Sequence, residues 1–214
     1  MHSKNQYNRY ANLKALGFNP KRVLDIGAYT GDWSLMLKEL FPEAKFTLVE
    51  PNEECIEKIK ANGFDDVHNL LLGDTKKRVV FNKCLTGCGE GNSVFKEQSV
   101  FPFETHLRQM ETLDDTLLGQ YDLIKMDTQG SESLILSGGE KTLAGASFVQ
   151  LETQVLEYNK LAPFSMDIIN QMDMLGFKLY DIVDFHYNSR GLLLQVDLLF
   201  APKNFVVFRL DCYS

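Results

Sequence analysis

The chain has 214 residues, of which 44% are hydrophobic and 24% charged, so it is long enough to bury a core and too apolar to be disordered. Its net charge of -7 disfavours a nucleic-acid partner, and no apolar run approaches the length of a membrane-spanning helix. Four scattered cysteines do not make a disulfide framework, so we expect reduced thiols in a single cytoplasmic domain over residues 1–214.

The first part of the chain alternates apolar runs with segments of helical spacing. Trp33, Leu37 and Leu40 recur at helical spacing, Asn52 is suited to cap a helix, and Gly63 is suited to end it. The pattern predicts a helical extension within residues 1–20, strands over 22–28, 44–51 and 67–73, and helices over 32–41 and 52–64.

An insertion over residues 77–107 interrupts this alternation. There "RVVFNKC" and "GNSVF" flank a glycine-rich turn, which predicts an extra hairpin. The alternation then resumes with strands over 121–127 and 146–153, a helix from Ser131 and another over 165–177, and two closing strands over 178–185 and 192–203. Strands that alternate with helices predict a parallel α/β sheet, and the closing pair, which has no helix between its strands, predicts an antiparallel edge.

The stretch "VLDIGAYTGDWS", Val23 to Ser34, reads as a strand, a glycine-bearing turn and the start of a helix. A dinucleotide fingerprint counted from Gly27 would need glycines at Tyr29 and Asp32, and a carboxylate at a helix start would repel a pyrophosphate. A cationic cofactor reverses that argument. S-adenosylmethionine carries a sulfonium, an ammonium and a ribose but no phosphate, so it fits an acidic site.

Glu50 ends the second predicted strand, about twenty residues beyond the turn, where an acid that binds ribose hydroxyls is expected. Asp74 follows the third strand and could accept a hydrogen bond from the adenine amino group. The alternatives are that Glu50 only begins a helix, that the glycines only allow tight packing, and that Asp74 only forms a turn. The residues expected to bind the cofactor are Asp25, Gly27, Ala28, Tyr29, Gly31, Asp32, Trp33, Glu50, Pro51, Asn52 and Asp74.

Several segments resemble the class I S-adenosylmethionine-dependent methyltransferases, and more specifically the FkbM family within them. They are "LDIGAYTGDWS", "LVEPN", "LLLGD", "TLDDTL", "LIKMDTQGSE", "LSGGEKTL", "VQLETQ" and "GLLLQVDLLF", and they cover nearly all of the chain from Arg22 to Lys203. The chain departs from the family at Tyr29, where the family usually has asparagine in "DIGANIG".

With the predicted elements, the resemblance implies a Rossmann-like, doubly wound, mostly parallel seven-stranded sheet with an antiparallel edge strand and a small inserted hairpin. It also implies O-methylation of a hydroxyl on a sugar or another small metabolite. The partner would then be a small molecule, with neither nucleic acid nor membrane involved. The substrate itself and the oligomeric state are not predicted.

Methyl transfer to a hydroxyl requires alignment of the acceptor and removal of its proton. Lys125 and Asp127 share one face of the fourth strand, and Glu152 ends the polar face of the fifth. His186 lies near a late strand end and has a near-neutral pKa. All four are candidate catalytic residues, and each has a structural alternative. We expect no metal, with Asp127, Glu152 and Asp197 as an alternative set of ligands for a divalent cation.

Two other functions use the same fold. Tyr29 and Asp32 in the turn disfavour an NAD-dependent oxidoreductase. The alternative of a module that binds a cofactor without catalysis is disfavoured only by the acidic residues at the strand ends. A nucleic-acid amino-methyltransferase is disfavoured further, because the fourth strand ends in "MDTQ" rather than in a Pro-Pro-aromatic loop.

Overall fold

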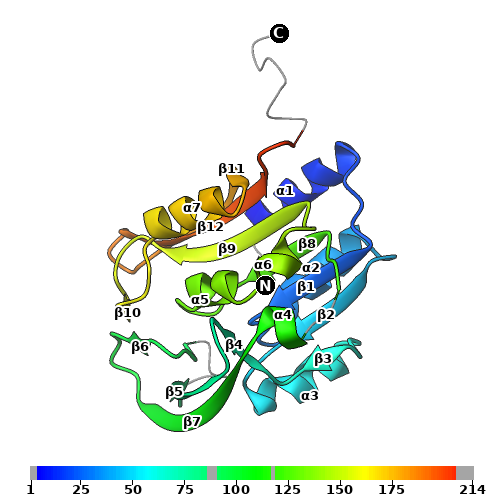
Figure 1. Ribbon diagram of the computed structural model, residues 1–214. Helices are drawn as coiled ribbons and strands as arrows, with labels where there is room; N and C mark the ends of the chain where they lie inside the picture. Colours follow the sequence, from blue (N-terminus) through cyan, green and yellow to red (C-terminus); the bar gives the residue numbers. More distant parts are fainter. Residues whose placement is uncertain (1–3, 86–90, 117–118, 206–214) are drawn as a thin grey trace.

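A computed structural model describes residues 4–85, 91–116 and 119–205. Its central sheet has seven strands in the order β3-β2-β1-β8-β9-β12-β11 (Figure 1). Neighbours from β3 to β9 run parallel, whereas β12 is antiparallel to both β9 and β11. The strands are β1 (Arg22–Ile26), β2 (Lys45–Val49), β3 (Val67–His68), β8 (Leu123–Met126), β9 (Phe148–Gln154), β11 (Phe177–Tyr187) and β12 (Leu193–Pro202). The predicted mostly parallel seven-stranded sheet is confirmed.

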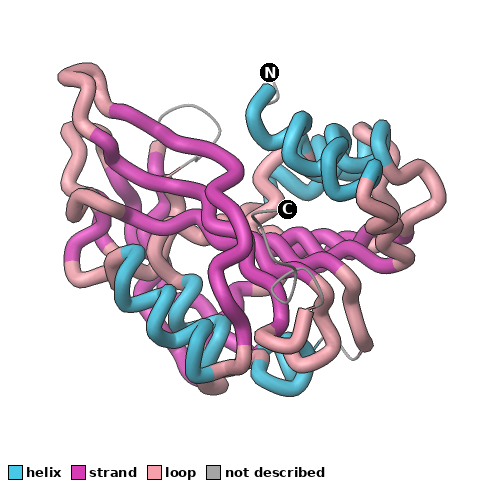
Figure 2. The backbone as a smooth tube through the Cα atoms, turned by 90° about the horizontal axis from the view of Figure 1, so that it is seen from above, coloured by secondary structure: helices cyan, strands magenta, loops and turns pink. Residues whose placement is uncertain are grey.

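Helices cover both faces of this sheet, as Figure 2 shows from above. Successive strand residues point to opposite faces, so Val23 packs into one buried cluster with α1 to α3, and Leu24 packs into another with α4 to α7. Both clusters are apolar, which explains why the inner strands read as continuous hydrophobic runs. The helices are α1 (Lys4–Ala15), α2 (Asp32–Leu40), α3 (Glu53–Ala61), α4 (Leu113–Thr116), α5 (Glu132–Ser137), α6 (Glu140–Leu143) and α7 (Ser165–Met174).

The antiparallel strand of the sheet lies one position in from the edge. β12 is hydrogen-bonded on both sides, to β9 and to β11, and β11 forms the edge itself. The two strands are joined by a short loop that includes Gly191, in the left-handed region at φ +75°. The predicted antiparallel edge is therefore a hairpin whose more apolar strand is the inner one.

A second, three-stranded sheet forms the insertion. It has the order β4-β7-β5, from β4 (Leu71–Gly73), β5 (Lys77–Cys84) and β7 (Phe103–Thr112). The predicted pairing of β5 with the "GNSVF" segment was wrong. β5 pairs along its whole length with β7, and a single β-bridge, Asn82 to Ser93, joins β5 to "GNSVF". The short β6 (Lys96–Glu97) pairs instead with β10 (Asn159–Lys160). The insertion therefore extends to Thr112 rather than to residue 107.

The single strand predicted over residues 67–73 is two strands in different sheets. β3 ends at His68 and stays in the central sheet, whereas β4 begins at Leu71 and joins β7. Between them the Asn69 side chain donates to the backbone oxygens of Glu50 and Pro51, at 3.0 and 3.1 Å. These bonds fix the chain where it leaves the central sheet.

Local signals place the helices that follow β1 and β2. The Asn52 side chain accepts from the Glu54 N–H and caps α3, as predicted, and Gly63 adopts φ +84° just beyond its end.

Cys55 and Cys84 are buried reduced thiols, whereas Cys88 and Cys212 lie outside the described residues. In the described part of the chain, no helix is long and apolar enough to cross a membrane.

Candidate active site

Two adjoining cavities, each of about 300 Å³, open at the carboxyl ends of the central strands. The first lies between β1, β2 and the insertion, and the second lies between β8, β9, β11, β12 and α1. They share Gly27, Tyr29, Asp32 and Asp127. Ligands of open parallel sheets bind at this end of the strands, so both cavities lie where a substrate or cofactor is expected.

The turn after β1 is the common boundary of the two cavities. Gly27, Tyr29 and Gly31 have φ values of +74°, +52° and +81°. A Cβ on Gly27 would lie 1.8 Å from the backbone oxygen of Asp127, so only glycine allows the turn to approach the end of β8. Tyr29 adopts a left-handed conformation that asparagine tolerates better, and asparagine is the residue that the family usually has at this position.

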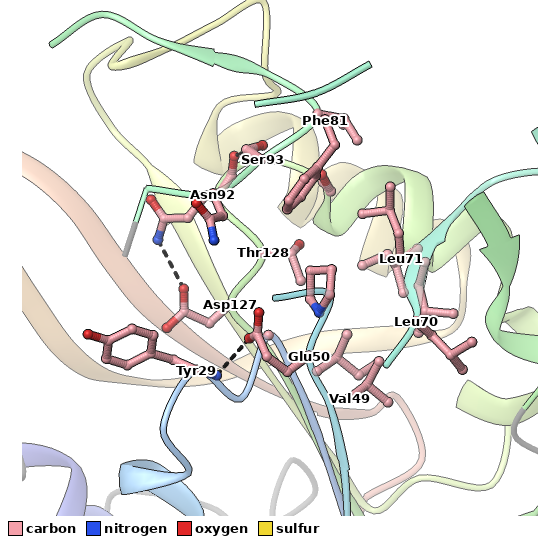
Figure 3. Close-up of a pocket in the computed structure, with 18 of the residues that line it drawn as sticks. Tyr29, Val49, Glu50, Leu70, Leu71, Phe81, Asn92, Ser93, Asp127 and Thr128 are labelled. Carbon is pink, nitrogen blue, oxygen red and sulfur yellow. Dashed lines mark hydrogen bonds between the residues drawn. The ribbon is translucent and has the colours of Figure 1, made fainter. Parts of the chain in front are cut away.

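Glu50 reaches into the first cavity from the end of β2 (Figure 3). Its two carboxylate oxygens accept from the backbone N–H groups of Tyr29 and Asn52, at 2.8 Å each. Burial raises the pKa of Glu50 to about 7, although these two hydrogen bonds oppose the shift. Each oxygen keeps a second lone pair with which to accept from a ligand.

The walls of the first cavity are largely apolar. Val49, Leu70 and Leu71 lie on one side of Glu50, and Phe81 lies above Leu71 (Figure 3). The insertion supplies this roof, together with Asn92 and Ser93. The cavity therefore combines an apolar slot with one buried carboxylate at its rim.

The predicted cofactor residues divide between the two cavities. Gly27, Tyr29, Asp32, Glu50 and Pro51 line the first cavity. Ala28 and Trp33 line only the second. The lining residues found among the described part of the chain do not include Asp25, Gly31, Asn52 or Asp74.

Asp74 and Asp25 have other contacts. The Asp74 carboxylate lies 2.7 Å from the Lys77 ammonium, a local contact that is compatible with the turn interpretation. Asp25 is buried beneath the turn, where it accepts from the Ser34 hydroxyl at 2.7 Å and lies 3.8 Å from the Lys125 ammonium. Burial raises the pKa of Asp25, and Lys125 and Ser34 oppose that shift. Asp25 thus supports the turn from below.

All four candidate catalytic residues line the second cavity. The Lys125 ammonium lies 3.1 Å from one oxygen of Asp127. The Gln129 amide donates to the other oxygen of Asp127 at 3.1 Å and to Glu152 at 2.7 Å, so it links the ends of β8 and β9. The His186 Nε2 atom lies 3.2 Å from Asp197 Oδ2.

The charges of these groups are strongly coupled. Burial by itself would raise the pKa of Asp127, but Lys125 and the hydrogen bonds to it lower that pKa overall. Burial and the nearby Asp127 and Asp197 raise the pKa of Glu152 well above its ordinary value. A hydrogen bond with Asp197 raises the pKa of His186. Of the two carboxylates, Asp127 therefore favours the ionised form more strongly than Glu152 does.

The sequence analysis did not predict three residues at the second cavity: Gln6 and Asp184, which line it, and Gln129, which donates to Asp127 and Glu152. Gln129 has a φ of +55°, and nothing in the local sequence indicates that its amide would bridge two strands. Asp184 could have been found, because it precedes His186 by two residues on the same strand and so shares its face. Gln6, on α1, reaches the cavity only through the packing of that helix.

One curated relative and many solved structures are similar to this chain. The relative is the 2-O-methyltransferase NoeI of Sinorhizobium fredii, which is 28% identical over 151 residues, 61% of this chain and 62% of that protein. The FkbM methyltransferase of Methylobacillus flagellatus superposes with a TM-score of 0.58 at 14% identity, over 90% of this chain and 47% of that one. This chain therefore spans less than two thirds of either protein.

A third protein carries a ligand. The magnesium protoporphyrin IX methyltransferase of Synechocystis, solved with bound S-adenosylmethionine, superposes with a TM-score of 0.53 at 11% identity, over 92% of this chain and 77% of that one. Structural likenesses at such identities show the fold alone. The methyltransferase FkbM domain, however, matches residues 25–179, more than half of the chain. The chain thus belongs to the FkbM methyltransferase family.

Proposed function

We propose that this methyltransferase transfers the methyl group of S-adenosylmethionine to a hydroxyl of a small molecule, a saccharide being the first candidate. The observation that carries the proposal is the pair of adjoining cavities, which meet at Gly27 and Asp127. The cofactor would occupy the first cavity and the acceptor the second, so that the methyl group lies near the shared boundary.

The first cavity suits the cofactor chemically. Glu50 can accept from both ribose hydroxyls, and the apolar slot beside Val49 and Leu71 suits an adenine ring. Asp32 and Asp127 place negative charge where the sulfonium and ammonium would lie. When bound, the cofactor supplies an electrophilic methyl group.

The second cavity suits a hydroxyl acceptor. Displacement at the methyl group requires the attacking oxygen to lie in line with the bond that breaks, and the acceptor must lose its proton. Asp127 lies at the boundary of the two cavities and is our candidate for orienting this hydroxyl or accepting its proton. Lys125 holds Asp127 in place and keeps it ionised. Glu152 and His186 line the same cavity and are the other candidates.

The relative named 2-O-methyltransferase supports a hydroxyl as the acceptor group. The acidic lining of the second cavity, with Asp184 and Asp197 beside Glu152, also suits a ligand with several hydroxyl donors. Both points favour a polyol or sugar over an apolar acceptor.

Calorimetric titration tests the cofactor assignment. The purified chain is titrated with S-adenosylmethionine, its demethylated product and NAD in parallel, and we expect micromolar binding of the first two and none of NAD. Binding of NAD alone would favour an oxidoreductase, and binding of none of the three would favour a module without turnover.

Transfer of a labelled methyl group to a panel of saccharides and other polyols then tests the reaction. Asp127→Asn should abolish transfer while S-adenosylmethionine still binds, and Asp74→Asn, outside both cavities, is the matched control. Wild-type turnover of Asp127→Asn across a full pH profile would remove Asp127 as the base.

A further inference from the structure

Carboxylates stand side by side across the strands that form the second cavity. In the registers of β12 with its two neighbours, Asp197 lies opposite Glu152 on one side and opposite Asp184 on the other. All three are at least nine-tenths buried. Like charges that face each other across neighbouring strands destabilise a sheet. Amide side chains donate to each carboxylate of this row, and a bound cation or protons would reduce the repulsion that remains.

His186 completes a compact set of donor atoms with two of these carboxylates. One oxygen of Glu152, one oxygen of Asp197 and a ring nitrogen of His186 all lie within 4.8 Å of one another. A cation with bonds of about 2.2 Å sets its ligand atoms about 3 to 4.4 Å apart, so small side-chain rotations close the set on an ion. The three ligands come from β9, β11 and β12, which hold them on a rigid sheet.

Neighbouring amides orient the two carboxylates. The Gln150 amide donates to Asp197 Oδ1 at 2.8 Å, and the Tyr10 hydroxyl donates to Gln150 in turn. Asp197 Oδ2 faces His186 and also accepts from the Gln6 amide at 3.3 Å. The Gln129 amide donates to Glu152 at 2.7 Å. Outer hydrogen bonds of this kind fix the ligands of protein metal sites.

We propose that Glu152, His186 and Asp197 form a divalent-cation site. Two carboxylates balance the charge of the ion. Carboxylates suit Mn²⁺ and an imidazole suits first-row transition metals, so Mn²⁺ is the probe cation. The cation alternative drawn from the sequence included Asp127, but the Asp127 oxygens face Lys125 and Gln129 and are not part of the compact set of donor atoms. His186 takes the third place instead, against the expectation that the protein has no metal.

The site lies in the second cavity, so ligand positions not filled by protein face the space assigned to the acceptor. There the cation would bind oxygen atoms of the acceptor and favour the ionised form of its hydroxyl. This role rests on the proposed function, whereas the cation site itself does not.

Direct binding of Mn²⁺ tests the site without any turnover. Trp33 is the one tryptophan of the chain and lines the same cavity, so bound Mn²⁺ should quench its fluorescence. Chain freed of metal with EDTA and then desalted is titrated with Mn²⁺ alone, and the free ion is counted by its paramagnetic resonance signal. We expect one ion bound per chain, with quenching that saturates at the same concentration.

His186→Ala should weaken Mn²⁺ binding at least tenfold, and because this side chain is half-exposed the variant should keep its fold. His68→Ala is the matched control, since His68 lies 2.8 Å from Asp66 on the surface and is not part of the ligand set. Asp197→Asn should weaken binding similarly, with thermal unfolding measured alongside.

Failure of wild-type chain to bind Mn²⁺ at millimolar concentration, or equal losses in both histidine variants, would overturn the proposal and assign protons to the carboxylate row. Binding of Mn²⁺ without any methyl transfer would leave the cation site standing and contradict the proposed function. Methyl transfer that is unchanged by EDTA would contradict the catalytic role of the cation alone.

Discussion

Glu50→Gln isolates the contact assigned to the ribose of the cofactor. The wild-type carboxylate accepts one backbone N–H on each oxygen and keeps one lone pair on each for a ribose hydroxyl. In the glutamine variant one oxygen becomes an NH₂ group, which faces the N–H of Tyr29 or Asn52 and can no longer accept from the ribose. The volume of the side chain hardly changes, so the effect on the cavity is chemical rather than steric.

The expected loss is large enough to measure. A hydrogen bond to a charged group contributes about 1.5 to 3 kcal/mol, and 1.4 kcal/mol corresponds to a tenfold change in affinity. The Kd for S-adenosylmethionine should therefore rise about 10- to 100-fold in Glu50→Gln. Asp74→Asn should leave this Kd unchanged, because Asp74 lines neither cavity.

The pH dependence gives a second readout of the same contact. The pKa of Glu50 is raised to about 7, so the acceptor form is lost as pH falls through that value. The wild-type Kd should increase by about tenfold per unit below pH 7, and this slope should be absent in Glu50→Gln. Calorimetry from pH 5.5 to 8.5 measures both effects. A folded Glu50→Gln variant with wild-type affinity and the same slope would refute the assignment.

Three further predictions concern stability and are measured by urea unfolding. Gly27→Ala should lower the free energy of unfolding by about 3 kcal/mol or more, because it combines a left-handed conformation with an overlap at Asp127; a loss below 1 kcal/mol would contradict the close approach. Tyr29→Asn should raise the free energy of unfolding by about 1 kcal/mol, because asparagine tolerates the left-handed conformation better than tyrosine does. Tyr29→Phe should leave the free energy of unfolding unchanged. Burial raises the pKa of Glu132 from 4.5 to about 7, so the folded state binds more protons between these values and its stability falls as pH rises through them. Glu132→Gln should remove about 3 kcal/mol of this decline, and identical pH profiles for the two proteins would contradict it.

Local periodicity predicted most strands of the central sheet and most of the helices that cover it, whereas the seven-stranded, doubly wound arrangement was implied by the family resemblance together with these elements. β1, β2 and β8 are short apolar runs followed by a glycine or an acid, and α3 has both a cap at Asn52 and a stop at Gly63. Because parallel strands end at one edge, Asp127, Glu152 and His186 could be expected in one place, and the structure brings them to one cavity.

The insertion could not be predicted in this way, because its pairing is decided by distant residues. β5 ends at Cys84, and its partner β7 begins only at Phe103, whereas the nearer "GNSVF" segment looked equally suitable. The sequence does indicate that β12 is an inner strand. Leu193–Pro202 is a nearly continuous apolar run, as buried strands are, whereas β11 carries several exposed polar residues. The role of Asp74 stays a prediction, and its carboxylate pairs with the Lys77 ammonium at 2.7 Å.

The second cavity is built by elements from opposite parts of the sequence. Gln6 comes from α1, the first described helix, and Asp184, His186 and Asp197 come from the last two strands, whereas the first cavity uses only the segments from Ile26 to Ile135. With the acceptor in the second cavity and the cofactor in the first, as proposed, acceptor preference could diverge through changes in α1, β11 and β12 while the cofactor contacts are kept. A chimera that exchanges only these elements between two members of the family should carry over the acceptor choice of the donor while it retains the cofactor affinity of the recipient.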